Sequence, residues 1–258
     1  MTFPKVKVPK PMVLGLSGLS FVIVAYLGLF QAHAQSEMAF KHQQIELAIN
    51  PIVHFIPPTN ERVKTTRGGA SRTAVRKCMQ DEPYQTALTP VLPAAGESLT
   101  VSSHPTFWVY IPETSAPQAH FTLKDADQRG IYQALVPISK TGGMLALELP
   151  EGEPGLELNK TYYWSVALIC QPTQSDIPAV EGQVKRILPG PSLRSQLAGK
   201  SDLQQAAIYG REGIWYDMLN NLAQPQQTQP NDSTITANWV EILSSEGLEA
   251  IATQPLLD

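Results

Sequence analysis

The stretch that decides the fold is LELNKTYYWSVALIC, residues 156–170. Tyr162, Trp164, Val166 and Leu168 are every second residue, so they share one face of an extended strand. This alternation is typical of a strand that has one buried face and one solvated face. We therefore expect a strand in the second half of the stretch, entered through a turn that contains two leucines.

The turn before this strand sharpens the prediction. Leu156 and Leu158 come shortly before Tyr162. This order resembles the tyrosine corner of immunoglobulin-like and fibronectin type III sandwiches, in which a tyrosine hydroxyl bonds to the backbone of the preceding turn. Other short runs of β-branched and aromatic residues, separated by turn residues, predict further strands. The expected strands are residues 99–102, 106–111, 120–124, 131–138, 144–149, 162–170 and 180–188.

The C-terminal part of the chain has a helical pattern instead. After Pro191 the apolar residues recur at spacings of three and four, which predicts one helix from a cap at Ser201 or Asp202 to about Leu222. A Pro/Gln/Asn loop at 225–232 follows, and then a second amphipathic helix from Ile235 to about Ser245, with Gly247 as its stop. The two helices would form a hairpin.

These patterns define the predicted fold class. No helical pattern separates the strands, which excludes parallel strand–helix–strand units. We expect an all-β sandwich of the immunoglobulin/fibronectin III-like type, with about 7 antiparallel strands, followed by a C-terminal helical hairpin. The expected divisions are 1–34, 35–97, 98–190 and 191–258, of which 35–97 is Pro-rich and largely irregular.

The N-terminus indicates export. Lys5, Lys7 and Lys10 precede an uncharged run from Met12 to Phe30, and Gln31-Ala-His-Ala follows, which is the order of a secretory signal peptide with cleavage after Ala34. The apolar run is also close to the length of about 20 residues that spans a bilayer, so an uncleaved membrane anchor is the alternative. In both cases the body of the protein lies outside the cytoplasm, either periplasmic or secreted.

Charge excludes one class of partner. Residues 1–34 hold three of the 19 Lys and Arg residues and none of the 23 Asp and Glu residues, so the exported chain has a formal charge of −7. A nucleic-acid binder normally gathers basic residues on one face. We therefore expect no nucleic-acid partner, and contact with a membrane only through an uncleaved signal.

The chain has two cysteines, Cys78 and Cys170, and the signal sequence predicts that they reach an oxidising compartment. This favours a disulfide between them, with two unrelated buried thiols as the alternative. Shortly before Cys78, Arg67 and Arg72 flank the turn Gly-Gly-Ala-Ser, which could offer backbone amides to an anion or could be an ordinary solvated turn.

No catalytic signature is present in the sequence. It lacks Gly-x-Ser-x-Gly, His-Glu-x-x-His, the glycine-rich phosphate loops and any Cys/His pattern with zinc spacing, so we expect no cofactor and no metal. His104 and His120 could share a metal, but ordinary hydrogen-bonding roles are the simpler interpretation. Trp108 and Tyr110 share a strand face, either as core residues or as a platform for sugar rings.

Several segments together resemble the cyanobacterial Domain of Unknown Function 928 family, over about residues 60–256. The most specific segment is AIYGREGIWYD, residues 207–217, which is followed later in the chain by Trp239. The resemblance implies an exported protein without an assigned activity, and it provides no catalytic residues. The other segments are RGGASR (67–72) with Cys78, HPTFWVYIP (104–112), FTL (121–123), YYWSVALIC (162–170) and EGQVKR (181–186).

Two functions follow as hypotheses. The first is an exported, non-catalytic interaction or structural module of the cell envelope with a protein partner. The second is a carbohydrate-binding or carbohydrate-active envelope protein that uses aromatic residues of the sandwich. The candidate interaction residues are Arg67, Arg72, Tyr209, Trp215, Tyr216 and Trp239. We expect the segment from Tyr209 to Asp217 to act chiefly in packing, whereas Trp239 either packs on the sandwich or docks a partner.

Overall fold

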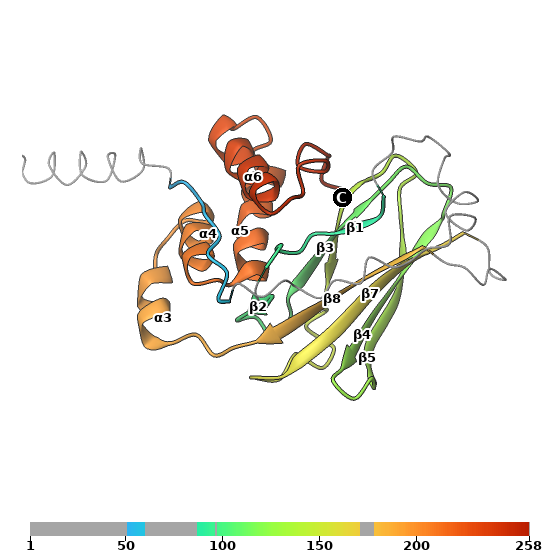
Figure 1. Ribbon diagram of the computed structural model, residues 1–258, viewed down its shortest axis with the longest axis horizontal. Coiled ribbons are helices and arrows are strands. Elements are labelled where there is room, and N and C mark those ends of the chain that lie inside the picture. Colours follow the sequence, from blue (N-terminus) through green and yellow to red (C-terminus); the bar gives the residue numbers. More distant parts are fainter. Residues whose placement is uncertain (1–50, 60–86, 96, 171–177, 258) are drawn as a thin grey trace, which may run out of the picture. The chain divides into compact units, whose positions relative to one another are not determined.

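A computed structural model describes residues 51–59, 87–95, 97–170 and 178–257 of the protein. Within these residues eight strands come first in the chain and four helices follow (Figure 1). The strands are β1 (Thr89–Pro90), β2 (Leu99–Thr100), β3 (Thr106–Ile111), β4 (Gln118–Asp125), β5 (Gly130–Pro137), β6 (Gly143–Glu148), β7 (Thr161–Ile169) and β8 (Ala179–Arg186). The helices are α3 (Pro191–Leu197), α4 (Asp202–Arg211), α5 (Trp215–Thr228) and α6 (Ser233–Ser245).

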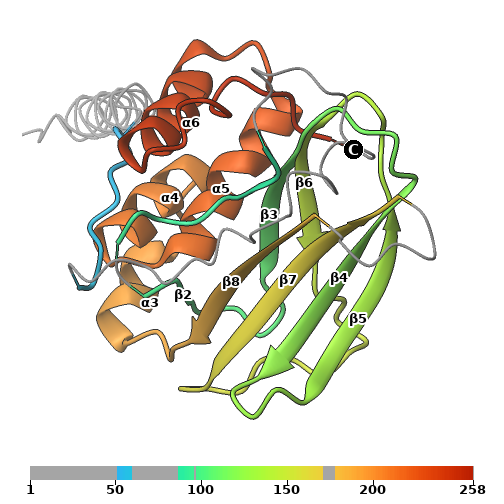
Figure 2. The same ribbon diagram turned by 45° about the vertical axis from the view of Figure 1, so that its right-hand side comes forward.

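The strands form two sheets that face each other. One sheet has the order β1-β3-β6 and the other β2-β8-β7-β4-β5 (Figure 2). Phe107 of β3 joins them, since its ring lies 5.2 Å from that of Phe121 on β4 and 5.6 Å from that of Trp164 on β7. Aromatic contacts at these centroid distances are favourable beyond the area they bury.

Strand β3 lies between two layers. Phe107 faces the larger sheet, whereas the next residue, Trp108, contacts Trp239 of α6 with ring centroids 6.1 Å apart. Because successive side chains of a strand point to opposite faces, both faces of β3 are covered, and all six of its residues are buried. Strands β4 and β7 alternate between buried and less buried residues because only one of their faces is covered.

The strand prediction is confirmed in outline and differs in two details. The structure has eight strands where the sequence predicts about 7, since Thr89–Pro90 also pairs with β3. Two residues that include a proline carry too little pattern to be recognised in a sequence. Strand β2 pairs with β8 in parallel, whereas the other pairs are antiparallel.

The helical hairpin prediction is wrong in its number of helices. The structure has two helices, α4 and α5, where the sequence predicts one. Gly213 lies between them with a φ of +71°, in the left-handed region that favours glycine. The apolar residues keep their spacing of three and four across Gly213, so this spacing does not reveal the break between the two helices. An additional helix, α3, begins with Pro191, and α5 continues through Pro225 to Thr228 instead of ending before it.

The predicted cap at the start of α4 and the predicted stop of α6 are confirmed, whereas α6 begins at Ser233, two residues before the predicted Ile235. Ser201 caps α4 in a capping box with Gln204, in which each side chain accepts from the other residue's backbone amide. Helix α6 ends at Ser245, and Gly247 follows with a φ of +75°.

Part of the irregular N-terminal segment packs closely on the helices. Val53 is fully buried, and its amide donates a 2.7 Å hydrogen bond to Asn238 of α6. The amide of Ile56 donates to the carbonyl of Gly210. Residues 51–59 therefore have no regular structure but contribute to the core. In the described ranges, no helix combines the length and the apolar character needed to cross a bilayer.

Candidate functional site

The segment from Tyr209 to Asp217, the most specific motif of the sequence, is the junction between the helices and the sheets. Its two glycines allow this placement. A side chain at Gly210 would collide with the carbonyl oxygen of His54, so the N-terminal segment could not approach α4. Gly213 makes the left-handed turn that directs Trp215 and Tyr216 toward the sheets.

Trp215 anchors α5 to two irregular segments. It is fully buried, and its indole Nε1 donates a 3.0 Å hydrogen bond to the carbonyl oxygen of Val91, which follows β1. The ring of Phe55 meets it edge to face at 4.9 Å. A buried indole usually has a partner for its N–H group, and here that partner fixes the chain beside β1.

Tyr216 links α5 to the larger sheet. Its hydroxyl accepts a 2.8 Å hydrogen bond from Nε1 of Trp164 on β7 and donates one of 2.8 Å to the carbonyl oxygen of Gln183 on β8. Its ring also lies edge-on to that of Phe107. Burial strongly raises the pKa of this phenol, so the hydroxyl stays protonated and can donate.

Asp217 ties the first turn of α5 to the segment after β2. Its Oδ2 accepts hydrogen bonds from Thr100 Oγ1 (2.8 Å) and from the backbone amide of Val101 (3.0 Å). Burial raises the pKa of the carboxyl to about 6, although these two hydrogen bonds favour the charged form. Burial and the nearby Asp217 raise the pKa of Tyr209 to about 12.

A small polar hollow of about 130 Å³ lies beside Asp217. Ser102, His104 and Asn221 are among the side chains that line it. The His104 ring already has partners, Ser103 Oγ at 3.1 Å and the carbonyl oxygen of Glu153 at 3.0 Å. The hollow has room for a few water molecules, and a carboxyl with a pKa of about 6 could exchange a proton with them.

The structure places the helix candidates inside the protein. Tyr209, Trp215, Tyr216 and Trp239 are all buried, with at most 8% of the surface of any of them exposed. Their side chains therefore pack within the protein and do not form a surface for a partner. Sequence patterns alone could not separate these roles, because an apolar stripe on a helix suits both.

The strand aromatics considered as a sugar platform are also buried. Trp108 is 3% exposed and Tyr110 is 5% exposed, so neither ring can stack on a sugar ring in this structure, and Trp164 of β7 is buried as well. Trp108 Nε1 is buried without a hydrogen-bond partner among the described residues. Trp164 lies against Gly182 of β8, where any side chain would collide with the indole ring.

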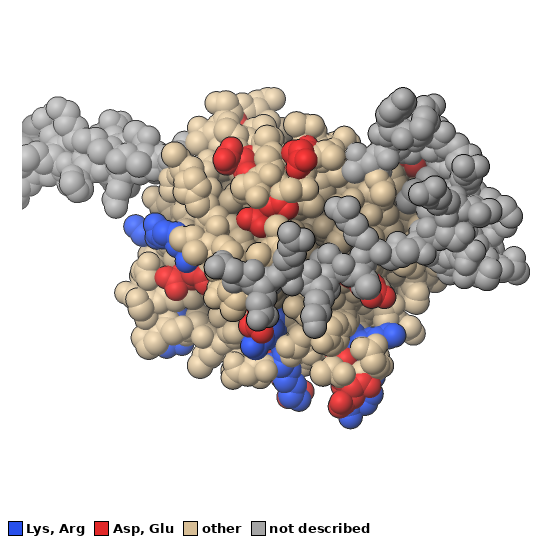
Figure 3. Space-filling view, in the orientation of Figure 1, with Lys and Arg blue, Asp and Glu red and all other residues tan. Residues whose placement is uncertain are grey.

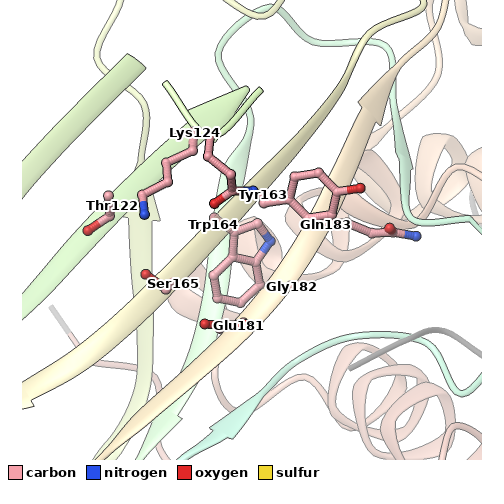
Figure 4. A pocket seen from close by; sticks show the side chains of 9 residues that line it. Thr122, Lys124, Tyr163, Trp164, Ser165, Glu181, Gly182 and Gln183 are labelled. Carbon is pink, nitrogen blue, oxygen red and sulfur yellow. The ribbon is translucent and has the colours of Figure 1, made fainter. Parts of the chain in front are cut away.

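A hollow that the sequence does not reveal lies on the outer face of the larger sheet, over β4, β7 and β8 (Figure 4). It has a volume of about 220 Å³, and the half-exposed ring of Tyr163 stands at its side. The alternation of β7 could have placed Tyr163 on this face, but the hollow also depends on Gly182 of β8. Its other lining residues are Thr122, Lys124, Gln128, Trp164, Ser165, Glu181 and Gln183.

Charge is dispersed over the visible surface. On the face shown in Figure 3, the upper part carries acidic side chains, the basic side chains lie at the left and along the lower edge, several beside acidic ones, and no extended basic patch is present. In the part of the chain that the structure describes, no three His, Cys, Asp or Glu side chains gather at a metal-binding distance. His120 lies on β4, and His104 comes before β3.

Some predicted residues lie outside the described ranges. These are the signal sequence 1–34, Arg67, Arg72 and Cys78. Cys170 directly follows β7, which ends one residue earlier than the predicted strand, and its pairing with Cys78 stays a prediction.

A comparison with protein families identifies the family of the chain. A family model described as Domain of Unknown Function (DUF928) matches residues 67–256. This range includes both sheets, all four described helices and the junction from Tyr209 to Asp217. No curated protein matches the chain.

Proposed function

The chain belongs to the family described as Domain of Unknown Function (DUF928), and we propose that it is an exported, non-catalytic interaction and structural module of the cell envelope. The observation that carries this proposal is the junction of Trp215, Tyr216 and Asp217. These residues hold α5, both sheets and the N-terminal segment together. The most specific motif of the family resemblance thus builds a rigid body, and partners would bind elsewhere on it.

We place the two sheets in the immunoglobulin/fibronectin III-like class of sandwiches. The strand order supports this, because β1, β3 and β6 match strands A, B and E of such a sandwich, and β8, β7, β4 and β5 match G, F, C and C′. A tyrosine corner supports it as well. The backbone amide of Glu157 donates a 3.0 Å hydrogen bond to the hydroxyl of Tyr162 at the start of β7, the strand that corresponds to F.

Export is part of the proposal. The basic residues, the apolar run and the Ala-His-Ala site at 32–34 together form a signal peptide. A body outside the cytoplasm would form the bridge between Cys78 and Cys170, which closes a long loop and stabilises the fold. The chain-entropy model gives about 4.5 kcal/mol for a loop of this length.

Affinity capture tests the proposal. The chain, purified in the form that the expressing cell exports, is used as bait in envelope extract and in cytoplasmic extract of equal protein content. We expect it to retain the same few envelope proteins at moderate and high salt and nothing specific from cytoplasm. An exported chain that retains no protein and instead degrades an envelope polymer would overturn the proposal.

The hollow at Tyr163 favours a second candidate, carbohydrate binding. An exposed aromatic ring beside amide and hydroxyl side chains can stack on a sugar ring and bond to its hydroxyls. Tyr163→Ala should then lower retention on envelope polysaccharide. Leu158→Ala is the matched control, because Leu158 is 41% exposed, close to the 42% of Tyr163, and does not line the hollow. Equal retention of both variants and the wild type would exclude this site.

A further inference from the structure

The outer edge of β5 is an open strand edge of a kind that proteins usually protect. Unpaired strand edges attract other strands, and natural proteins limit this by short strands, charged residues, prolines, bulges or covering segments. In β5 the proline and the pairing irregularity lie at the two ends, so residues 132–136 between them have neither. Figure 2 shows β5 at the edge of the five-stranded sheet. The strand runs from Gly130 to Pro137 with the sequence GIYQALVP, which contains no charged residue.

The other sheet edges in the described residues are short or partly covered. Strands β1 and β2 have two residues each, and α5 holds β2 through Asp217 and Thr100. The C-terminal tail covers the start of β6, where the amide of Met144 donates to Pro255 and the amide of Leu257 donates to Met144. The tail bonds to β6 only at Met144, and β6 contains the charged residue Glu148, so β5 is the longest open edge among the described strands and carries no charge.

The hydrogen-bond pattern shows which backbone groups face outward. The amide of Ile138 donates to Pro117, next to the pair of Gln118 with Pro137. Because bonding alternates along an antiparallel pair, the groups of Ala134 point to β4 and those of Gln133 and Leu135 point away from it. No other group in the described part of the chain bonds to these outward amides and carbonyls. The Leu135 side chain is 59% exposed beside them.

We propose that β5 pairs with β5 of a second copy of this chain, so that the two larger sheets join across a twofold axis. This deepens the proposed function, on which it rests, by naming one partner. The pairing is antiparallel, and strand addition of this kind takes its affinity from main-chain hydrogen bonds and its specificity from alternate side chains. Since β5 carries no charge, self-pairing brings no like charges together.

One register fits the strand best. With Ala134 on the axis, Gln133 of each copy lies opposite Leu135 of the other, and each such pair exchanges two backbone hydrogen bonds. The same register sets Tyr132 opposite Val136 of the other copy, an aromatic–β-branched pair. A register with Gln133 on the axis would instead pair Leu135 with Ile131 of the other copy. Ile131 lies at the irregularity between Leu123 and Lys124 in the pairing of β5 with β4.

Proline scanning tests the pairing. Gln133→Pro removes a backbone amide that has no partner within the described residues, so the monomer should keep its fold. The outer edge of β5 loses one hydrogen-bond donor, and the pyrrolidine ring of the proline takes its place. Gln133→Thr is the matched control, because it also removes the glutamine side chain but keeps the amide. A single strand pair is smaller than a standard stable interface of about 1,600 Å², so light scattering is performed at on the order of 100 µM protein.

We expect the wild type and Gln133→Thr to have the mass of a dimer and Gln133→Pro the mass of a monomer, with equal melting temperatures for the two variants. A monomeric wild type, or a Gln133→Pro variant that stays dimeric, would overturn the proposal. If Gln133→Pro melts much lower than Gln133→Thr, cross-linking decides instead. Ala134→Cys should form a covalent dimer under mild copper oxidation, because Cα atoms in a non-hydrogen-bonded pair lie about 4.5 Å apart.

Gln133→Cys is the control for the register, since this residue would lie opposite Leu135 and not opposite itself. Faster cross-linking of Gln133→Cys than of Ala134→Cys would contradict the register. The outcome also separates the two proposals. A monomeric wild type that captures envelope proteins refutes only the self-pairing, whereas a dimer that captures none and degrades an envelope polymer refutes only the proposed function.

Discussion

Replacing Asp217 with asparagine should stabilise the protein near neutral pH and remove a pH dependence from the wild type. Burial raises the pKa of this carboxyl from 3.8 to about 6 in the folded protein. The folded state therefore binds a proton more tightly than the unfolded chain does. The stabilising contribution of the protonated group is complete below about pH 4 and is lost as the pH rises through about 6.

The size of the effect follows from the pKa difference. One pKa unit corresponds to about 1.4 kcal/mol, so the buried carboxylate costs about 3 kcal/mol above pH 6, to order of magnitude. Asparagine is neutral at every pH in this range, and its side-chain oxygen can still accept from Thr100 and Val101. We therefore expect Asp217→Asn to exceed the wild type in free energy of unfolding by about 3 kcal/mol at pH 7 and to be close to it at pH 4.

Urea unfolding at intervals between about pH 4 and pH 8 measures this difference. Asp202→Asn provides the control for the loss of one negative charge, because Asp202 is exposed in the first turn of α4. A difference between Asp217→Asn and the wild type that is constant across the pH range, or that decreases as the pH rises, would refute the reasoning from burial.

Three further predictions concern the junction and the exported chain. Tyr216→Phe leaves Trp164 Nε1 and the Gln183 carbonyl without their partner, so it should lower the free energy of unfolding by about 2 to 4 kcal/mol. Tyr163→Phe on the outer face is the control and should change it little. Equal effects of the two substitutions would contradict the role of the buried hydroxyl. Thiol titration of the unreduced exported chain should detect no free sulfhydryl, and two would rule out the bridge between Cys78 and Cys170. Mass spectrometry of the exported chain should find Gln35 as its first residue, and an intact Met1 would establish the anchor instead of the cleaved signal.

The sequence predicts the strands well where one face is buried and the other is not. In β4 and β7 the alternation is visible in the residues themselves, so their positions follow from local pattern. The hydrogen bond to the Tyr162 hydroxyl could also be predicted, because its donor, the backbone amide of Glu157, lies only five positions earlier. Local order along the chain is sufficient for such features.

Contacts between distant segments could not be predicted in this way. Asp217 meets Thr100 across 117 positions, and Trp215 meets Val91 across 124. The break at Gly213 was also hidden, because the apolar stripe continues from α4 into α5. The open edge of β5 depends on which strands are neighbours, and strand order is a property of the whole fold.

The central claim is that the motif from Tyr209 to Asp217 builds the body and that partners bind elsewhere, first at the β5 edge. Melting temperature and association state, measured side by side for Trp215→Ala and Gln133→Pro, test it most directly. Trp215→Ala should cost about 3 to 5 kcal/mol and roughly 10 °C, because a fully buried indole and its hydrogen bond are lost. Gln133→Pro should keep its melting temperature and lose the dimer. The reverse result would contradict the account: Trp215→Ala keeps its melting temperature but no longer dimerises, and Gln133→Pro still dimerises.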